Sequence, residues 1–257
     1  MGLLQKLLEL FTGKANKKPN LRKFRRVLEE AMADGILTEA EIDDIEALKR
    51  EFGLSEETVQ KFRRRAYSIA FRASVEKEPY SPRKERELEH IRSYLKLTDA
   101  ELRPYTLKLE RMRAFYNLEV GNLPRVDVPG LELPRGEQAH WSAHVAVLDD
   151  KGQDGAVLRA PEANGSETKL PDWPVANKGV LIATNERFMF KGGGKAFQIE
   201  LFDVRGISFF QDGLHLDAEA GKSKVLRFLK RTDVELADAT LKHVLQRAKV
   251  KKSKPQA

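Results

Sequence analysis

A run of alternating segments between residues 179 and 230 constrains the fold of this chain more than any other feature. Val180 and Ile182, and then Phe188 and Phe190, alternate with polar or small residues. A period of two places alternate side chains on one face of a strand. The same alternation continues at Phe197, Ile199, Leu201, Leu214 and Leu216. We therefore expect a meander of short strands over this stretch.

Turn residues separate these segments. Breaks fall at 184–186, 192–194, Asp212-Gly213 and 220–222, and Asp-Gly between alternating runs is a strong hairpin signal. After residue 230 the apolar spacing becomes helical over 232–249. Strands followed by one helix predict a small barrel that is closed by its C-terminal helix.

The strand pattern extends toward the N-terminus. Alternation from Ala139 to Val147 predicts a first strand, and 156–159 predicts a short one. Residues 161–178 form a long polar stretch, and loops of this length are often binding loops or mobile ones. Residues 119–135 are rich in proline and glycine, which predicts a linker before the strand domain.

Residues 20–118 predict an all-helical domain with an internal repeat. When the sequence is shifted by 43 positions, 38–62 aligns with 81–105 without a gap. Each half begins at a helix cap, and Thr38 with Glu41 has the spacing of a capping box. Thr98 with Glu101 has it again. Two helix-turn-helix halves that pack their apolar faces together would form a bundle.

Three acidic residues of the first half, Asp34, Glu39 and Glu41, are candidate ligands for a divalent metal. A calcium loop needs an oxygen ligand at its third position. Counting from Gly35 as the sixth position places Met32 there, so we expect a plain turn and cap rather than calcium. No other cofactor is expected.

The N-terminal segment 1–18 predicts a short amphipathic helix followed by a basic linker. Its apolar face would be formed by Leu3, Leu4, Leu7, Leu8 and Phe11. An apolar face beside lysines is the form of an interfacial membrane anchor. The alternative is that this face docks on the helical domain or on a partner protein. We expect neither a signal peptide nor a membrane-spanning helix.

The net charge of +7 permits anionic partners without choosing among them. In the strand domain, the candidate contacts for an anionic ligand are Arg187, Lys191, Lys195, Lys222 and Lys224. Nucleic acid is not expected, because the basic residues are not interleaved with aromatic ones in a known module. The absence of cysteine excludes a cysteine nucleophile and thiolate metal sites. Four-residue spacing in a strand does not make His140 and His144 a zinc pair.

Two resemblances follow from these motifs. The pairing of A-D-G-I-L-T-x-x-E (33–41) with F-G-L-S (52–55), repeated as Y-S-P and L-K-L-T, resembles TerB-like domains of the tellurite-resistance type, over 20–118. This implies a link to stress response and to membrane-associated complexes, and a metal role for acidic turn residues. Gly136-Glu137 followed by GVLIATNERFMF (179–190) resembles bacterial PH-like and GRAM-type domains over 136–250. Those domains are seven-stranded barrel-like sandwiches capped by a C-terminal helix.

Together these features predict an α+β protein in which a helical bundle precedes a PH-like domain and a basic tail at 251–257. No catalytic triad, carboxylate pair or nucleotide-binding fingerprint is present in the sequence. We expect a non-catalytic adaptor of the cytoplasm, held peripherally at the inner face of the membrane, which binds a protein partner or anionic lipid. The alternative is a metal- or ligand-sensing stress protein that uses the acidic residues of the helical domain.

Overall fold

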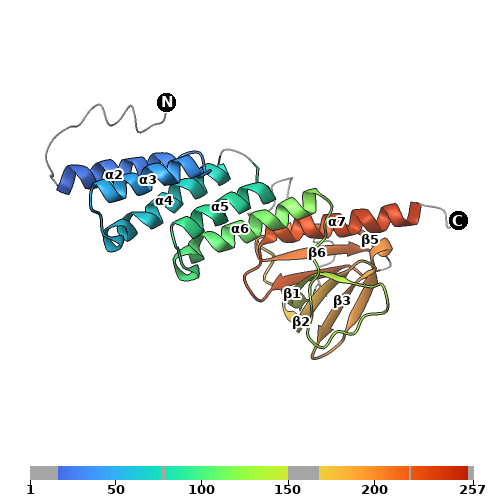
Figure 1. Ribbon diagram of the computed structural model, residues 1–257. Coiled ribbons are helices and arrows are strands. Elements are labelled where there is room, and N and C mark those ends of the chain that lie inside the picture. Colours follow the sequence, from blue (N-terminus) through green and yellow to red (C-terminus); the bar gives the residue numbers. More distant parts are fainter. Residues whose placement is uncertain (1–16, 77–78, 150–167, 220, 254–257) are drawn as a thin grey trace. The chain divides into compact units, whose positions relative to one another are not determined.

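The fold is described by a computed structural model that covers residues 17–76, 79–149, 168–219 and 221–253 (Figure 1). The chain divides into two compact units, residues 1–113 and 114–257. The first unit is helical, and the second holds a seven-stranded antiparallel sheet and a C-terminal helix. The fold class is therefore α+β. Within the described ranges, no helix combines the length and hydropathy needed to cross a bilayer.

Five helices are described in the N-terminal region. Their bounds are α2 Lys17–Ala31, α3 Glu39–Glu51, α4 Glu56–Glu76, α5 Pro82–Tyr94 and α6 Asp99–Glu119. The helices α3 and α5 begin at 39 and 82, and α4 and α6 begin at 56 and 99, so both pairs are offset by 43 residues. This offset equals the shift at which the two sequence segments align.

The helix starts are set by local hydrogen bonds. The Thr38 hydroxyl accepts the N–H of Glu41 at 3.3 Å, and the Glu41 carboxylate accepts the N–H of Thr38 at 2.9 Å. Thr98 and Glu101 repeat this exchange at 3.4 Å and 3.0 Å. Both predicted capping boxes are confirmed, and each satisfies two N–H groups that a helix start leaves unpaired.

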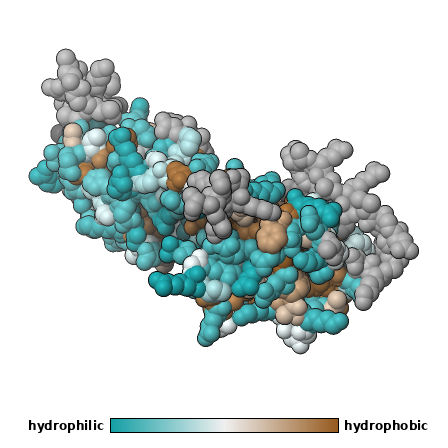
Figure 2. Space-filling model, turned by 90° about the vertical axis from the view of Figure 1, so that its right-hand side faces the viewer, coloured by the Kyte–Doolittle hydropathy of each residue, from teal (hydrophilic) through white to brown (hydrophobic). Residues whose placement is uncertain are grey.

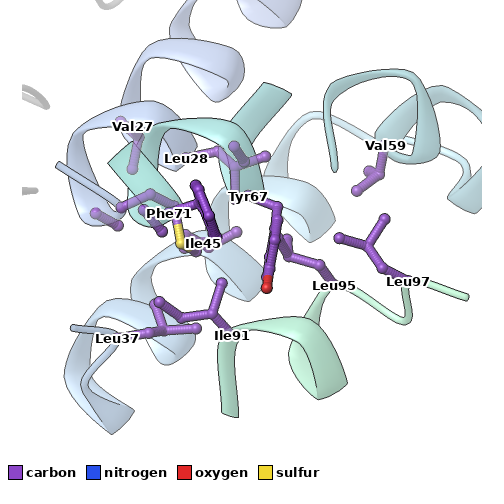
Figure 3. Close-up of a cluster of buried hydrophobic side chains, with 14 of the residues drawn as sticks. Val27, Leu28, Leu37, Ile45, Val59, Tyr67, Phe71, Ile91, Leu95 and Leu97 are labelled. Atoms are coloured by element: carbon purple, nitrogen blue, oxygen red, sulfur yellow. The ribbon is translucent and has the colours of Figure 1, made fainter. Parts of the chain in front are cut away.

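The core of the helical unit gathers side chains from all of its first four helices. Leu28, Ile45, Ile91 and Leu95 are no more than 2% exposed, and Figure 3 shows them grouped with Tyr67 of α4. Burying one such side chain contributes roughly 1.5–3 kcal/mol. This burial, more than helix propensity, holds short helices such as α3 and α5 in place.

The second unit contains one antiparallel sheet with the strand order β4-β3-β2-β1-β7-β6-β5. The bounds are β1 Ala139–Leu148, β2 Val175–Thr184, β3 Arg187–Gly192, β4 Phe197–Glu200, β5 Val204–Phe210, β6 Gly213–Ala218 and β7 Lys224–Phe228, with the 3-10 turn η2 Leu201–Asp203 between β4 and β5. The predicted meander and its four turns are confirmed.

One face of the sheet forms the main core with α7 (Val234–Ser253). Leu181, Phe188 and Leu214 from the strands are fully buried with Leu241 and Val244 of α7, and Figure 1 shows α7 running along the sheet. The Asp233 carboxylate caps the helix by accepting the N–H of Leu236 at 3.1 Å. The helix continues to residue 253, so the first three residues of the expected 251–257 tail are helical.

The stretch 119–135, expected to be a linker, packs on the sheet. Val128, Leu131 and Leu133 contact a second buried cluster that includes Ile182 and Met189. The backbone N–H of residue 126 donates to the carbonyl of residue 139 at 2.9 Å. These residues are physically part of the second unit.

The described part of the expected loop, residues 168–178, packs on the sheet. Leu170 and Trp173 are 5% and 9% exposed and pack with Leu148, Phe210 and Val225. Strand β2 already begins at Val175. The remainder of that loop and the expected strand at 156–159 lie outside the described residues.

Candidate functional site

Two of the three candidate metal ligands, Asp34 and Glu41, make local hydrogen bonds at the start of α3. The Asp34 carboxylate accepts the N–H of Ile36 at 2.9 Å, and Glu41 belongs to the α3 capping box. Glu39 is the exposed first residue of α3. No group of three or more His, Asp or Glu side chains suited to a metal occurs in the part of the chain that the structure describes. Metal binding by these residues stays a prediction.

Arg187, an expected anion contact, is engaged by the protein itself. Its Nε donates to Glu137 Oε1 at 3.0 Å and its Nη2 donates to Glu137 Oε2 at 2.9 Å. Its Nη1 donates to the Gln198 side chain at 3.0 Å. The guanidinium therefore ties the start of β1 to β3 and β4.

The four expected lysine contacts lie at strand ends or turns, and three of their ammonium groups have protein partners. Lys191 donates to the carbonyl of Gly130 at 3.2 Å, and Lys222 pairs with Asp203 at 2.6 Å. The Lys224 ammonium donates to the Ser223 carbonyl at 3.0 Å and lies 5.8 Å from the centre of the Phe197 ring. Lys195 is exposed in the turn between β3 and β4, where its carbonyl accepts the Asn177 amide at 3.1 Å.

The two histidines of β1 differ in environment. His140 is 7% exposed, and its Nδ1 lies 2.6 Å from the carbonyl oxygen of Pro124. His144 is exposed on the same strand. The buried ring therefore holds the preceding segment against β1.

Basic residues gather along the last three turns of α7. We term residues 242–253 the α7 basic end. It carries Lys242, Arg247, Lys249, Lys251 and Lys252 and no acidic residue. Val250 is 52% exposed within it, and Lys242, Leu245, Gln246, Lys249 and Val250 line one open surface hollow. The face of the molecule in Figure 2 shows mainly hydrophilic residues with hydrophobic areas between them.

The helical unit also holds a concave site, with a volume of about 220 Å³. Its floor is formed by the apolar side chains of Phe24, Leu28, Ile45, Val59 and Leu95, and its rim by Glu46, Lys49, Glu56, Arg63, Tyr94 and Lys96. We term this site the helical pocket. Sequence reasoning missed it because its residues come from four helices and no local motif joins them.

Charges are concentrated at the rim of the helical pocket. Lys49 donates to Glu56 at 2.8 Å, and Arg63 donates to the other oxygen of the same carboxylate. The hydrogen bonds from Lys49 and Arg63 lower the pKa of Glu56 to about 2. Burial raises the pKa of Tyr94, whose hydroxyl donates to Glu46 at 3.2 Å.

The expected membrane or partner face of Leu3, Leu4, Leu7, Leu8 and Phe11 lies outside the described residues.

Comparison with known proteins assigns no family: no family model and no curated protein matches this chain. Among solved structures, the chain is similar to the C-terminal domain of an unknown protein from Leishmania infantum, with 13% identity, a TM-score of 0.30, and coverage of 55% of this chain and 98% of that chain. It is also similar to the hSac2 domain from human phosphoinositide phosphatase Sac2, with 12% identity, a TM-score of 0.28, and coverage of 62% and 87%.

Proposed function

We propose that this protein is a non-catalytic adaptor that is held at an anionic membrane surface through the α7 basic end and recruits a protein partner through its helical unit. We further propose that the helical unit is a TerB-like bundle of two repeated halves and that the second unit is a PH-like barrel. The 43-residue offset of the helices and the paired capping boxes support the first assignment. Seven antiparallel strands closed by one helix support the second.

The α7 basic end is the observation that carries the proposal. Five cationic residues occur within about three turns of one helix, and no acidic residue occurs in those turns. Lys242 pairs with Asp238 of the preceding turn at 2.7 Å, and Arg247 donates to the carbonyl of Gly121. A cationic side chain near an anionic leaflet contributes roughly 1 kcal/mol of binding free energy. The exposed Val250 adds apolar surface of the kind that an interfacial helix buries.

A single weak contact gives only marginal membrane attachment, so stable binding needs two signals. Segment 1–18 supplies the second in this proposal, through the face formed by Leu3, Leu4, Leu7, Leu8 and Phe11. Electrostatic attraction by the lysines of the α7 basic end and burial of this apolar face would then both contribute to the free energy of membrane binding.

Vesicle co-sedimentation tests the proposal. The full chain, the chain without residues 1–18, and the triple variant K249E/K251E/K252E are each mixed with phosphatidylcholine vesicles that contain or lack phosphatidylserine. We expect the full chain to pellet only with the anionic vesicles. The triple variant should lose most of this binding, and the truncated chain should lose part of it.

A matched control separates position from total charge. K178E/K230E/R231E changes the net charge by the same amount at exposed residues of the same unit. This control should keep most of the binding. Equal binding by the two triple variants, or no pelleting of the full chain, would remove the membrane part of the proposal.

A further inference from the structure

One carboxylate at the rim of the helical pocket is held by cations from three different elements. Lys49 of α3 donates to Glu56 Oε2 at 2.8 Å, and Arg63 of α4 donates to Oε1. Lys96, in the turn after α5, donates to Oε1 at 3.4 Å. These contacts place three cationic groups around one carboxylate.

Arg63 is the buried partner of this ion pair, and Glu56 is the exposed one. The Arg63 side chain is only 9% exposed, whereas the side chain of Glu56 is 48% exposed. A buried guanidinium needs a hydrogen-bonded anion, because removing that anion leaves an uncompensated buried charge. Glu56 lies at the first position of α4, so its side chain has room to turn toward solvent while Arg63 stays.

The pocket beside these cations is lined by apolar side chains. Phe24, Leu28 and Ile45 are each 1% exposed, and Val59 and Leu95 are 7% and 2% exposed. Figure 3 labels four of these five residues, Leu28, Ile45, Val59 and Leu95, in the buried cluster. A pocket with an apolar lining and a few converging polar groups is the usual form of a small-molecule site.

We propose that the helical pocket binds a small organic carboxylate, whose carboxylate group takes the place of Glu56 between Lys49, Arg63 and Lys96 and whose apolar body lies on the pocket floor.

The charges of the rim allow one carboxylate to replace another. Its three cations face two carboxylates, those of Glu46 and Glu56. A ligand carboxylate in the place of Glu56 keeps two anions among these three cations, and displaced Glu56 regains its hydration. Because Glu56 already binds the three cations, a ligand carboxylate alone gains little binding free energy. Only a ligand that also buries apolar surface displaces Glu56.

Titration calorimetry on the full chain tests this inference with three probes. The compound 3-phenylpropionate has both groups, acetate has only the carboxylate, and 3-phenylpropanol has only the apolar body. We expect 3-phenylpropionate to bind the wild-type chain and the other two probes to bind at least about tenfold more weakly, a difference of about 1.4 kcal/mol. No binding of 3-phenylpropionate up to its solubility limit, or equal binding of the acid and the alcohol, overturns the inference.

Variants test the place of binding. Glu56→Ala removes the internal competitor and should lower the dissociation constant for 3-phenylpropionate about tenfold. Arg63→Gln should abolish binding, whereas Arg65→Gln, at an exposed position of the same helix, should leave it unchanged. If Arg63→Gln does not fold, as judged by circular dichroism, Lys49→Gln replaces it with the same expected loss. An unchanged dissociation constant for 3-phenylpropionate in Glu56→Ala overturns the inference that the ligand displaces Glu56.

The helical pocket lies in the helical unit, and the proposed membrane contact lies at the α7 basic end. A loss of ligand binding and a loss of vesicle binding are therefore distinguishable results.

Discussion

The guanidinium of Arg187 and the carboxylate of Glu137 form a two-point ion pair, with N–O distances of 3.0 Å and 2.9 Å. The side chain of Glu137 is 5% exposed, and the hydroxyl of Thr184 donates to it at 2.8 Å. A carboxylate buried to this degree depends on its cation, because removing one partner of a buried pair leaves an uncompensated charge. The pair therefore joins the start of β1 to β3.

We expect Arg187→Ala to destabilise the strand unit by about 3 kcal/mol. Arg187→Lys should lose less, since an ammonium keeps the charge but not the two-point geometry. Urea unfolding followed by tryptophan fluorescence measures this unit alone, because both tryptophans, Trp141 and Trp173, lie in it. Lys195→Ala, at an exposed turn position, is the control and should change stability little. A loss below about 1 kcal/mol in Arg187→Ala would show that the pair is not structural.

A second prediction concerns the turn between α5 and α6. Lys96 has a φ of 49°, and among the described residues it is the non-glycine residue in the left-handed region. At the equivalent position after α3, Gly53 has a φ of 60°. Glycine adopts this conformation without steric cost. Lys96→Gly should therefore raise the free energy of unfolding of the helical unit by about 1 kcal/mol.

Thermal unfolding followed by far-UV circular dichroism checks the effect of Lys96→Gly. Lys96→Ala is the control, because it removes the ion pair with Glu56 but keeps a side chain at positive φ. A gain in melting temperature for both variants would mean that the lysine itself, rather than the backbone conformation, is unfavourable.

Acid sensitivity of the helical unit is a third prediction. Lys49 and Arg63 lower the pKa of Glu56 to about 2 from an ordinary value of 4.5. The folded state therefore gains stability above pH 4.5, and this gain is lost as the pH falls toward about 2. Because Glu56 is half exposed, the gain is about 1 kcal/mol or less.

Glu56→Gln should remove this dependence. The stability difference between wild type and variant, measured by urea unfolding with far-UV circular dichroism, should be largest near neutral pH and should vanish at the acid end. A difference that stays constant down to the lowest pH would contradict the role assigned to the carboxylate.

A fourth prediction uses two glycines of neighbouring strands. A Cβ at Gly213 would lie 2.2 Å from the carbonyl oxygen of Leu226 and 2.4 Å from Leu170 Cδ1, whereas a Cβ at Gly206 would meet nothing within 4 Å. Gly213→Ala should destabilise the strand unit by about 2–3 kcal/mol, since the backbone of β7 must shift. Gly206→Ala should be neutral or slightly stabilising. Similar tryptophan-monitored urea midpoints for the two variants would contradict this contrast.

Local signals predict the elements of this fold well. Alternation at Phe188 and Phe190 and the Asp212-Gly213 turn act within a few residues, so strand and hairpin positions follow from them. Helix starts follow from Thr38 and Thr98 for the same reason. In contrast, the packing of Leu131 on the sheet depends on partners about 50 residues away, and the proline and glycine content of that stretch resembles that of a free linker.

The candidate sites were harder to predict because their partners are remote in sequence. Arg187 looks like a free cation until Glu137 is placed beside it, fifty residues earlier in the chain. Arg63 of the helical pocket lies in an arginine run that resembles a solvated helix face, and only the tertiary packing shows it to be buried. For the α7 basic end, the run of basic residues is visible in the sequence. The sequence did not predict that the helix continues to residue 253.

The proposed membrane contact is tested most directly at one residue of the α7 basic end. The chain contains no cysteine, so a single introduced cysteine can carry an environment-sensitive fluorophore. Val250 and Val175 are exposed valines of the same unit, at 52% and 46%. Val250→Cys reports on the basic end, and Val175→Cys serves as the control.

With phosphatidylserine-containing vesicles, the account predicts a blue shift and an intensity gain for the probe at position 250 and none at position 175. Both probes should stay unchanged with phosphatidylcholine alone. An unchanged probe at position 250 while the protein pellets with the anionic vesicles, or equal shifts at both positions, would contradict the claim that the α7 basic end is the contact surface.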